Sequence, residues 1–378
     1  MQKHHILNNF TSITPRHLID QDVAVKWLAR KHGEVKNLEA GEPVEESVSR
    51  AEKRFLRYAV KSSKIAQRGF EVPDLAGDQK DEFFQFANPE RPLSGPPLGD
   101  RHRFFVKRAH EVMESIYPDK SVAPSHIVHV TCTGYVSPSP AQLLVNQRGW
   151  QGQTDITHAY HMGCYAAVPA VRVAVGLVSN SPSEVVDIVH TEMCTLHMNP
   201  QLDSPEQTIV QSLFSDGHIR YSVSQDDGKR RGFKILTIKE KLIPDTIQDM
   251  SWVPEDWGFR MNLSREVPDA IGKNLRGFME TLVKAADKEL GDVLSNAVFA
   301  VHPGGPRIID SVQEILELRD DQTEESKTVL RTRGNMSSAT LPHIWQRLEA
   351  RRLKAGTTVV SLAFGPGLTI FGSVFETV

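Results

Sequence analysis

The chain has 378 residues, enough for one large or two medium-sized domains with a substantial core. The formal net charge is −3, whereas proteins that bind nucleic acids or membrane surfaces in general carry an excess of basic residues. We therefore expect neither a nucleic acid nor a membrane surface as a partner. No stretch approaches 18 consecutive apolar residues, and the N-terminus carries no signal-peptide pattern. Three cysteines are too few for a disulfide framework. We therefore predict a cytoplasmic protein without a membrane span.

The first third of the chain alternates between charge-rich and proline-rich stretches. Residues 34–56 predict a helix, whereas 71–103 holds many prolines and charges and predicts a long surface loop. A second helix is expected over 104–116. The pattern then changes to a β-like run over 125–131 and a short helix over 141–147.

An almost continuous run of Ala, Val, Leu and Pro over 166–178 predicts a buried helix. Pro169 lies near its start, because proline deeper in a helix would cost roughly 3 kcal/mol. We therefore place Cys164 at the turn into this helix. Residues 185–192 predict a strand buried on both faces, and 233–242 lie in or beside another strand.

A second half of the chain begins near residue 226 and repeats the outline of the first. Its predicted elements are a helix over 268–290, a strand over 297–301, a helix over 308–318, and β runs over 357–363 and 368–375. Alternating buried strands and helices indicate an α/β protein. Each half has a strand, a turn with a reactive side chain (Cys164, then His302) and an apolar helix. We therefore expect two halves, 1–225 and 226–378.

The turn around Cys164 favours a reactive thiol. A cysteine at a helix N-terminus lies near the positive end of the helix dipole and near free N–H groups, which lower the pKa of its thiol. A histidine close by would complete the activation as a thiolate–imidazolium pair. The sequence thus predicts a nucleophile at Cys164.

Two later turns supply candidate partners for this thiol. His302 follows a buried strand and precedes Pro303-Gly304-Gly305-Pro306, which leaves room beside the imidazole. Asn335 follows a glycine, and its amide is suited either to cap a helix or to donate to an oxyanion. A thiol, an imidazole and a carboxamide in turns suggest a covalent acyl-transfer site.

Together with Gly365-Pro366-Gly367-Leu368-Thr369 near the C-terminus, these segments resemble the thiolase-fold condensing enzymes. The similarity is greatest to the type III polyketide synthases, the chalcone synthase and alkylresorcinol/alkylpyrone synthase family, and is clear from about residue 120 onward. The resemblance implies a thiolase-like duplicated α-β-α-β-α five-layer fold and a homodimer. It also implies that Cys164 carries an acyl chain, while His302 and Asn335 hold the thioester oxygen of malonyl during decarboxylation.

The resemblance extends to residues around a substrate cavity. Phe214 matches the family's gatekeeper aromatic between the pantetheine tunnel and the cavity. The other positions that match the cavity lining are Cys132, Thr133, Cys194, His197, Met261 and Ser337. Any one of them alone is equally typical of ordinary core packing.

Four basic residues match positions that meet coenzyme A. Arg54, Arg57 and Lys61 correspond to the cluster that binds its phosphates, and their spacing puts them on one helix face. Arg307 falls near the mouth of the pantetheine tunnel, where it suits either coenzyme A or the phosphate of an acyl carrier protein. The alternative for such a stripe of charge is a solvated surface.

Two other site types deserve comparison. His190, Cys194 and His197 would share one face of a helix and could suggest a metal box, but 185–192 is strand-like, so we predict no metal. His158 and His161 could pair with Cys164 as a thiol hydrolase, which would leave the later motifs unexplained.

The sequence therefore predicts a type III polyketide synthase-like acyltransferase that uses acyl-CoA and malonyl-CoA and needs no other cofactor. Decarboxylative Claisen condensation would be followed by cyclisation to a pyrone or resorcinol-type product. The alternative is a carrier-protein-dependent, single-step ketosynthase or acyltransferase of the ketoacyl-ACP synthase III type. A non-catalytic subunit of the same fold is disfavoured by the intact Cys164, His302 and Asn335.

Overall fold

A computed structural model describes residues 4–75, 82–86, 88, 90–305 and 307–378. Its main feature is a nine-stranded sheet in the order β11-β12-β13-β8-β1-β7-β6-β4-β5, which runs through both halves of the chain. The strands are β1 (His5–Ile13), β4 (His126–Thr131), β5 (Asp155–Tyr160), β6 (Val185–Met193), β7 (Asp216–Gln225), β8 (Phe233–Leu242), β11 (Val298–Val301), β12 (Thr358–Gly365) and β13 (Thr369–Thr377).

The two halves of the sheet repeat one pairing pattern. In the first half β4 is parallel to β6, β6 is antiparallel to β7, and β7 is antiparallel to β1. In the second half β11 is parallel to β12, β12 is antiparallel to β13, and β13 is antiparallel to β8. A short antiparallel pairing of β1 with β8 joins them. The repeated pattern is that of a duplicated unit.

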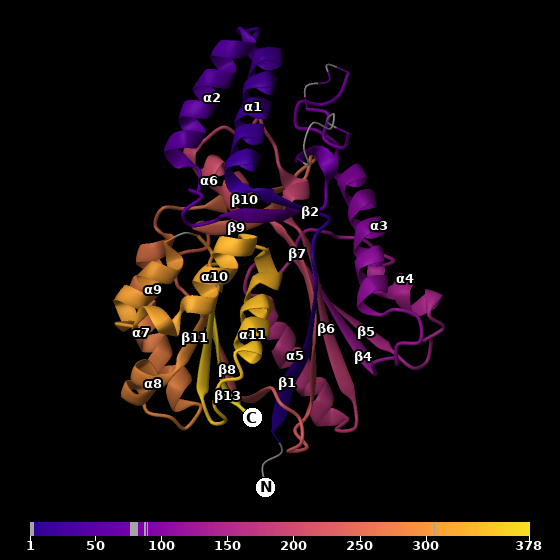
Figure 1. The fold of residues 1–378 in the computed structure, drawn as a ribbon, viewed down its shortest axis with the longest axis vertical. Coiled ribbons are helices and arrows are strands. Elements are labelled where there is room, and N and C mark those ends of the chain that lie inside the picture. Colours follow the sequence, from indigo (N-terminus) through magenta and orange to yellow (C-terminus); the bar gives the residue numbers. More distant parts are fainter. Residues whose placement is uncertain (1–3, 76–81, 87, 89, 306) are drawn as a thin grey trace.

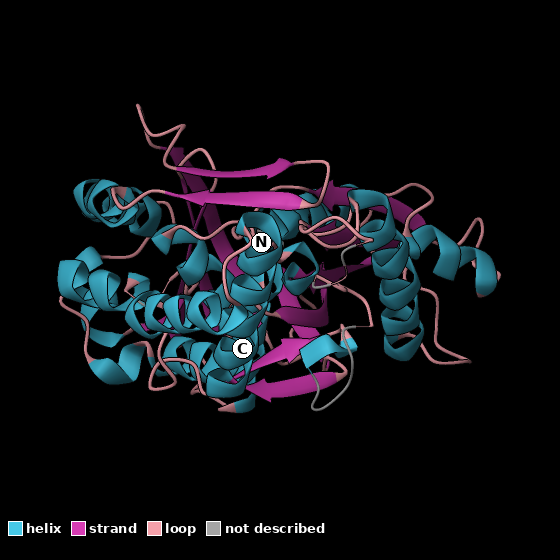
Figure 2. Ribbon diagram, turned by 90° about the horizontal axis from the view of Figure 1, so that it is seen from above, coloured by secondary structure: helices cyan, strands magenta, loops and turns pink. Residues whose placement is uncertain are grey.

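Helices complete five layers, which Figure 1 shows side by side. In the middle, α5 (Ala167–Asn180) and α11 (Thr340–Ala350) share one apolar cluster with strands of both halves. On one outer side, α3 (Leu98–Ile116) and α4 (Pro140–Gln147) pack on β4 and β6. On the other lie α7 (Val267–Lys284), α8 (Leu290–Asn296) and α9 (Ile308–Leu316). Viewed from above, helices flank the strands (Figure 2). The predicted five-layer α/β fold is confirmed.

Helix α5 shows why the nucleophile turn lies where it does. Its buried face consists of small and β-branched residues, so the helix packs closely between the strands. Pro169 falls in the first turn, where its missing N–H costs little. The helix therefore begins at Ala167, and Cys164 lies just before it, as predicted.

A cap covers one end of the layers (top of Figure 1). It comprises α1 (Gln21–Ala40), α2 (Val44–Tyr58), α6 (Pro205–Leu213), the β2 (His17–Asp20)–β3 (Gln67–Phe70) pair and the β9 (Met250–Pro254)–β10 (Phe259–Leu263) hairpin. Outside the cap, α10 (Glu324–Arg333) ends just before Gly334 and Asn335. No helix in the described ranges is long and apolar enough to cross a membrane.

Two sequence predictions for the first 103 residues were wrong. The single helix expected over 34–56 is two helices, because Gly41 ends α1 with a φ of 67° and Pro43 precedes the start of α2. The loop expected over 71–103 ends sooner, since α3 already begins at Leu98. Within that segment, residues 76–81, 87 and 89 lie outside the described ranges.

Candidate active site

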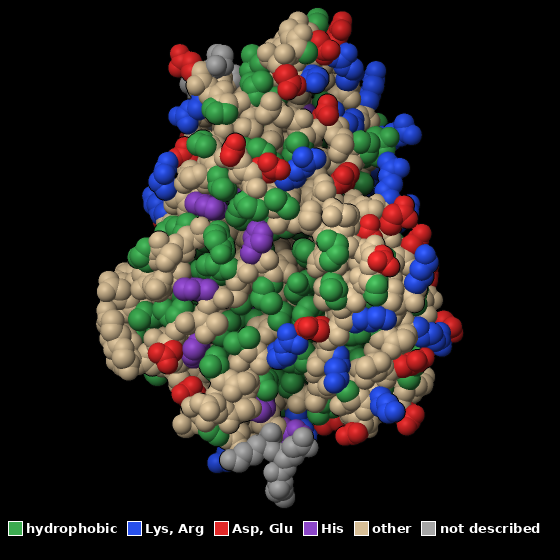
Figure 3. Space-filling view, turned by 180° about the vertical axis from the view of Figure 1, so that it is seen from behind, with side chains coloured by type: hydrophobic (Ala, Val, Ile, Leu, Met, Phe, Trp, Pro, Cys, Tyr) green, Lys and Arg blue, Asp and Glu red, His purple; other side chains and the backbone are tan. Residues whose placement is uncertain are grey.

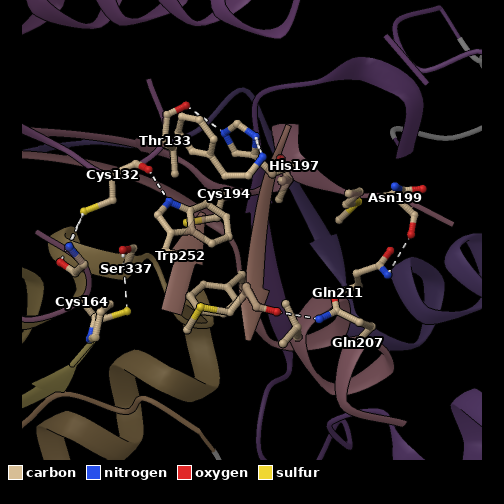
Figure 4. A pocket seen from close by; sticks show the side chains of 18 of the residues that line it. Cys132, Thr133, Cys164, Cys194, His197, Asn199, Gln207, Gln211, Trp252 and Ser337 are labelled. Atoms are coloured by element: carbon tan, nitrogen blue, oxygen red, sulfur yellow. Dashed lines mark hydrogen bonds between the residues drawn. The ribbon is translucent and has the colours of Figure 1, made fainter. Parts of the chain in front are cut away.

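One cavity collects residues from both halves and from the cap (Figure 4). Its described lining contains no Asp, Glu, Lys or Arg, so the cavity is electrically neutral. All seven cavity positions named from the sequence line it together with Cys164. The lining residues are Cys132, Thr133, Gly163, Cys164, Cys194, Thr195, His197, Met198, Asn199, Gln207, Val210, Gln211, Phe214, Trp252, Trp257, Phe259, Met261, Ser337 and Pro366.

Cys164 is buried in a turn that is fixed from two sides. Its Sγ lies 3.7 Å from Ser337 Oγ. The preceding Gly163 has a φ of 83° and donates its N–H to Cys132 Sγ at 3.1 Å. A Cβ at Gly163 would lie only 2.4 Å from Pro366 Cδ. Only glycine fits this approach, so Cys132 and the Gly-Pro-Gly turn set the position of Cys164.

Asn335 is fully buried, with one side of its amide bound and the other available. Its Oδ1 accepts the Ser337 N–H at 2.9 Å, whereas its Nδ2 has no hydrogen-bond partner in the described part of the chain. Its backbone is held by Leu213 and Ser215, between which lies Phe214, the expected gatekeeper. The amide plane is thus fixed with its donor edge free.

His302 follows β11 and is held through its backbone. Its N–H donates to Leu362 O at 2.8 Å, and strand β12 continues from Leu362 to Gly365. A Cβ at Gly365 would lie 3.5 Å from the backbone nitrogen of Cys164, so the same strand reaches both residues. Both ring nitrogens of His302 are buried without a partner among the described residues. Pro306, the last residue of its motif, lies outside those ranges.

Burial sets the charge states of the thiol and the imidazole. It raises the pKa of the Cys164 thiol to about 12, against a smaller lowering by the Ser337 hydroxyl. It lowers the pKa of His302 to about 3. Both shifts favour the neutral thiol and the neutral imidazole in the unliganded protein, whereas the sequence predicted a thiolate at Cys164. Cys164 precedes the N-cap, Ala166, so it lies outside the helix, and desolvation is the largest influence on the pKa of its thiol.

His197 is a fixed wall of the cavity. Its Nδ1 accepts the Phe259 N–H at 3.0 Å, so the proton lies on Nε2, which donates to Thr133 O at 2.9 Å. The ring stacks on Phe259 with centroids 4.5 Å apart and meets Trp252 edge-on. Burial lowers the pKa of His197 to about 3, so it stays neutral.

Glu192 is a buried carboxylate that sequence reasoning missed. It accepts hydrogen bonds from the Cys132 N–H at 3.0 Å, from Thr133 Oγ1 at 2.9 Å and from Ser338 Oγ. Burial raises the pKa of Glu192. Glu192 thereby joins the Cys132–Thr133 segment and the Ser338 segment to its own strand, β6. A charged residue inside the strand predicted over 185–192 was the signal that could have identified it.

The histidines of the two alternative site types are engaged elsewhere. His190 bonds Ser338 Oγ and Tyr221 OH, and no group of three or more His, Cys, Asp or Glu side chains in the described ranges could hold a metal ion. His158 Nε2 lies 2.8 Å from Ser139 Oγ, and His161 Nε2 lies 2.8 Å from Trp252 O.

The four basic residues expected to meet coenzyme A divide into two groups. Arg57, Lys61 and Arg307 are exposed, and an ion pair of 2.9 Å between Lys64 and Asp310 joins the loop after α2 to α9. Arg54 is turned inward, where its Nη2 donates to His32 Nδ1 at 2.9 Å.

Comparison with known proteins gives consistent matches. The N-terminal and C-terminal domain models of the chalcone and stilbene synthases match residues 112–226 and 234–378. Type III polyketide synthase pspB of Penicillium soppii is 28% identical over 316 residues, 75% of this chain and 78% of that protein. Probable polyketide synthase 1 of Dictyostelium discoideum is 29% identical over 259 residues, 67% of this chain but only 8% of that much longer protein.

Solved structures show the same fold at low sequence identity. PKS-I from the brown alga Ectocarpus siliculosus has a TM-score of 0.86 at 22% identity, covering 100% of this chain and 99% of that one. The C-terminal type III polyketide synthase domain of Steely1 from Dictyostelium has a TM-score of 0.81 at 23% identity, covering 99% of each chain.

Proposed function

Because the chain belongs to the chalcone and stilbene synthase family, we propose that it loads an acyl chain from coenzyme A onto Cys164 and extends it with malonyl-CoA. The matches are type III polyketide synthases and not enzymes of the ketoacyl-ACP synthase III type, which removes that alternative. The observation that carries the proposal is the set of buried nitrogens on His302 and Asn335 that have no hydrogen-bond partner among the described residues, together with the bond from Asn335 to Ser337, which lines the cavity of Cys164.

The loading step starts from a neutral thiol and a neutral imidazole. Cys164 Sγ attacks the thioester carbonyl while its proton passes to His302. The bond from the carbonyl carbon to the coenzyme A sulfur breaks, and the leaving thiolate takes the proton back from His302. The products are an acyl thioester on Cys164, free coenzyme A and a neutral imidazole again.

The extension step uses the donors that the fold leaves free. When malonyl-CoA loses carbon dioxide, the electron pair of the broken bond forms an enolate, whose charge lies on the thioester oxygen. An N–H of His302 and the Asn335 Nδ2 would stabilise that charge, and each such donor is worth roughly 10²- to 10³-fold in rate. The enolate carbon then attacks the acyl thioester, and Cys164 leaves as a thiolate that solvent reprotonates.

The free nitrogens fit this step because an unpaired buried donor costs roughly 1–3 kcal/mol unless a ligand binds it. The neutral lining suits an uncharged acyl chain. Cyclisation of the extended chain to a pyrone or resorcinol-type product belongs to the same proposal.

We also propose that Arg57, Lys61 and Arg307 meet the phosphates of coenzyme A, since all three face solvent and the Lys64–Asp310 ion pair joins the loop after α2 to α9. Arg54 would join them after leaving His32. Coenzyme A thioesters would be the only cofactors, and the location would be cytoplasmic.

A homodimer is part of the proposal as well. On the face opposite to that of Figure 1, hydrophobic and histidine side chains occupy much of the middle, with charged side chains concentrated elsewhere (Figure 3). Depletion of charge is typical of the core of a subunit interface. Sedimentation at micromolar concentration tests the oligomeric state.

The direct test of activity is product analysis by mass spectrometry. We expect incubation with a panel of acyl-CoA starters and malonyl-CoA to yield chains extended by acetate units, including pyrones. Absence of products from coenzyme A substrates, together with activity from acyl carrier protein thioesters, would contradict the proposal.

A further inference from the structure

A buried guanidinium lies directly behind the outer wall of the cavity. Arg101, in the first turns of α3, is fully buried and is not itself a lining residue. Its Nε donates to Pro96 O at 2.8 Å and its Nη2 to Ser94 O at 2.6 Å. One side of the fork therefore fixes the loop that precedes α3.

The other side of the fork holds the cavity wall. Arg101 Nη1 donates to Met198 O at 3.0 Å and to Leu196 O. These two carbonyls flank His197, the neutral ring that lines the cavity. The Arg101 guanidinium also lies 5.6 Å from the ring of Trp257, another lining residue. A single side chain thus joins the proline-rich loop to the wall at 196–198 and to the β9–β10 hairpin.

The geometry of this contact is specific to arginine. In the described part of the chain, the hydrogen-bond partners of Arg101 are four carbonyl oxygens, arranged around a planar fork. Lysine carries a similar charge but has a single nitrogen, which cannot span carbonyls on both sides. The charge alone would therefore not hold the wall.

Gly258 shows how little room the wall has. A Cβ there would lie 3.1 Å from His197 Nδ1 and 3.6 Å from Arg101 Cδ. Because interiors are close-packed, a shift of either group is transmitted to the lining residues beside it.

We propose that Arg101 is a positioning residue that sets the shape of the acyl cavity and thereby determines which acyl chains the protein accepts. The proposal rests on the proposed function, because it assumes that this cavity receives the acyl chain. Without the guanidinium the 196–198 wall is free to move, and the fit to one chain length is lost.

The test measures binding without turnover, in a Cys164→Ala background. Saturated acyl-CoAs from butyryl- to palmitoyl-CoA are titrated while the fluorescence of the tryptophans, including Trp252 and Trp257 in the lining, is followed. We expect Arg101→Met to weaken binding of the preferred chain by about tenfold or more and to flatten the chain-length profile. Arg101→Lys should fail to restore it, and Gly258→Ala should alter the profile in the same way.

Arg148→Met is the matched control. Arg148 is also largely buried and donates to a backbone carbonyl, that of Tyr117, but none of its partners lines the cavity. Arg148→Met should keep the chain-length profile of the parent protein, although its loss of folding stability should be comparable to that of Arg101→Met.

An Arg101→Met protein whose profile stays within about twofold of the wild type at every chain length would overturn the proposal. If Arg101→Met does not fold, Gly258→Ala provides the test, since it disturbs the same wall and keeps every Arg101 donor. An unchanged chain-length profile of Gly258→Ala would also overturn the proposal. The two proposals can fail separately. If the wild-type protein makes no polyketide but binding in the Cys164→Ala background is selective and depends on Arg101, the proposed function is contradicted and the role of Arg101 is kept.

Discussion

The two ends of the cavity are built in different ways. At the reacting end, Cys164 and Asn335 lie in turns that backbone hydrogen bonds and obligatory glycines hold against the strands of the duplicated sheet. At the outer wall, the 196–199 segment and the β9–β10 hairpin are held by side chains, chiefly Arg101 and His197. On the proposals above, the duplicated scaffold would carry the chemistry and the outer wall of the cavity would carry the selectivity.

The largest effect should come from the reacting end. Cys164→Ala should reduce condensation by at least about 10⁴-fold, because it removes the proposed carrier of the acyl chain. Product formation from acyl-CoA and malonyl-CoA measures this loss. Cys194→Ala, which removes a thiol from the wall, should still become acylated. Full activity of Cys164→Ala would place the nucleophile elsewhere.

A smaller loss should follow from removing the free amide donor. Asn335→Asp keeps an acceptor for the Ser337 N–H but replaces the donor, so we expect decarboxylation of malonyl-CoA to fall by roughly 10²- to 10³-fold. Release of labelled carbon dioxide measures this step, and intact mass measures loading of Cys164, which should persist. Lost loading with normal decarboxylation would reverse the assignment.

The charge state of the nucleophile gives a test by pH. Burial raises the pKa of the Cys164 thiol to about 12. At any pH below that value, the thiolate fraction rises roughly tenfold for each unit by which the pH increases. Alkylation of Cys164 by iodoacetamide in the unliganded protein should therefore rise about tenfold per unit from neutral pH to pH ~10. Peptide mass mapping separates Cys164 from the other cysteines. A rate that is already constant at mildly acidic pH would show a thiolate–imidazolium pair instead.

The smallest effect should lie outside the cavity. Arg57→Glu should raise the KM for coenzyme A thioesters by about fivefold and make it less sensitive to salt, since an exposed charge contributes on the order of 1 kcal/mol. Steady-state kinetics at two ionic strengths measure the change. Arg103→Glu, on the exposed side of α3, is the control. Equal KM values for both variants would remove Arg57 from the site.

The reacting end of the cavity could be predicted from the sequence better than its outer wall. Motifs located Cys164 and the turns of His302 and Asn335, because glycines and prolines mark those turns locally. Burial could not be read at single residues, so the desolvation that raises the pKa of Cys164 and the burial of Glu192 were missed. Trp252 and Phe259 carry no motif, and they reach the cavity only through the tertiary placement of a short hairpin.

The central claim is that Cys164 holds the acyl chain which malonyl-CoA then extends. The most direct measurement is a single-turnover pulse and chase followed by mass spectrometry of the Cys164 peptide and of the released thioesters. We predict that the acyl adduct forms on Cys164 and disappears when malonyl-CoA is added, as a product longer by one acetate unit appears. An adduct that persists during product formation, or that forms on another residue, would contradict the account.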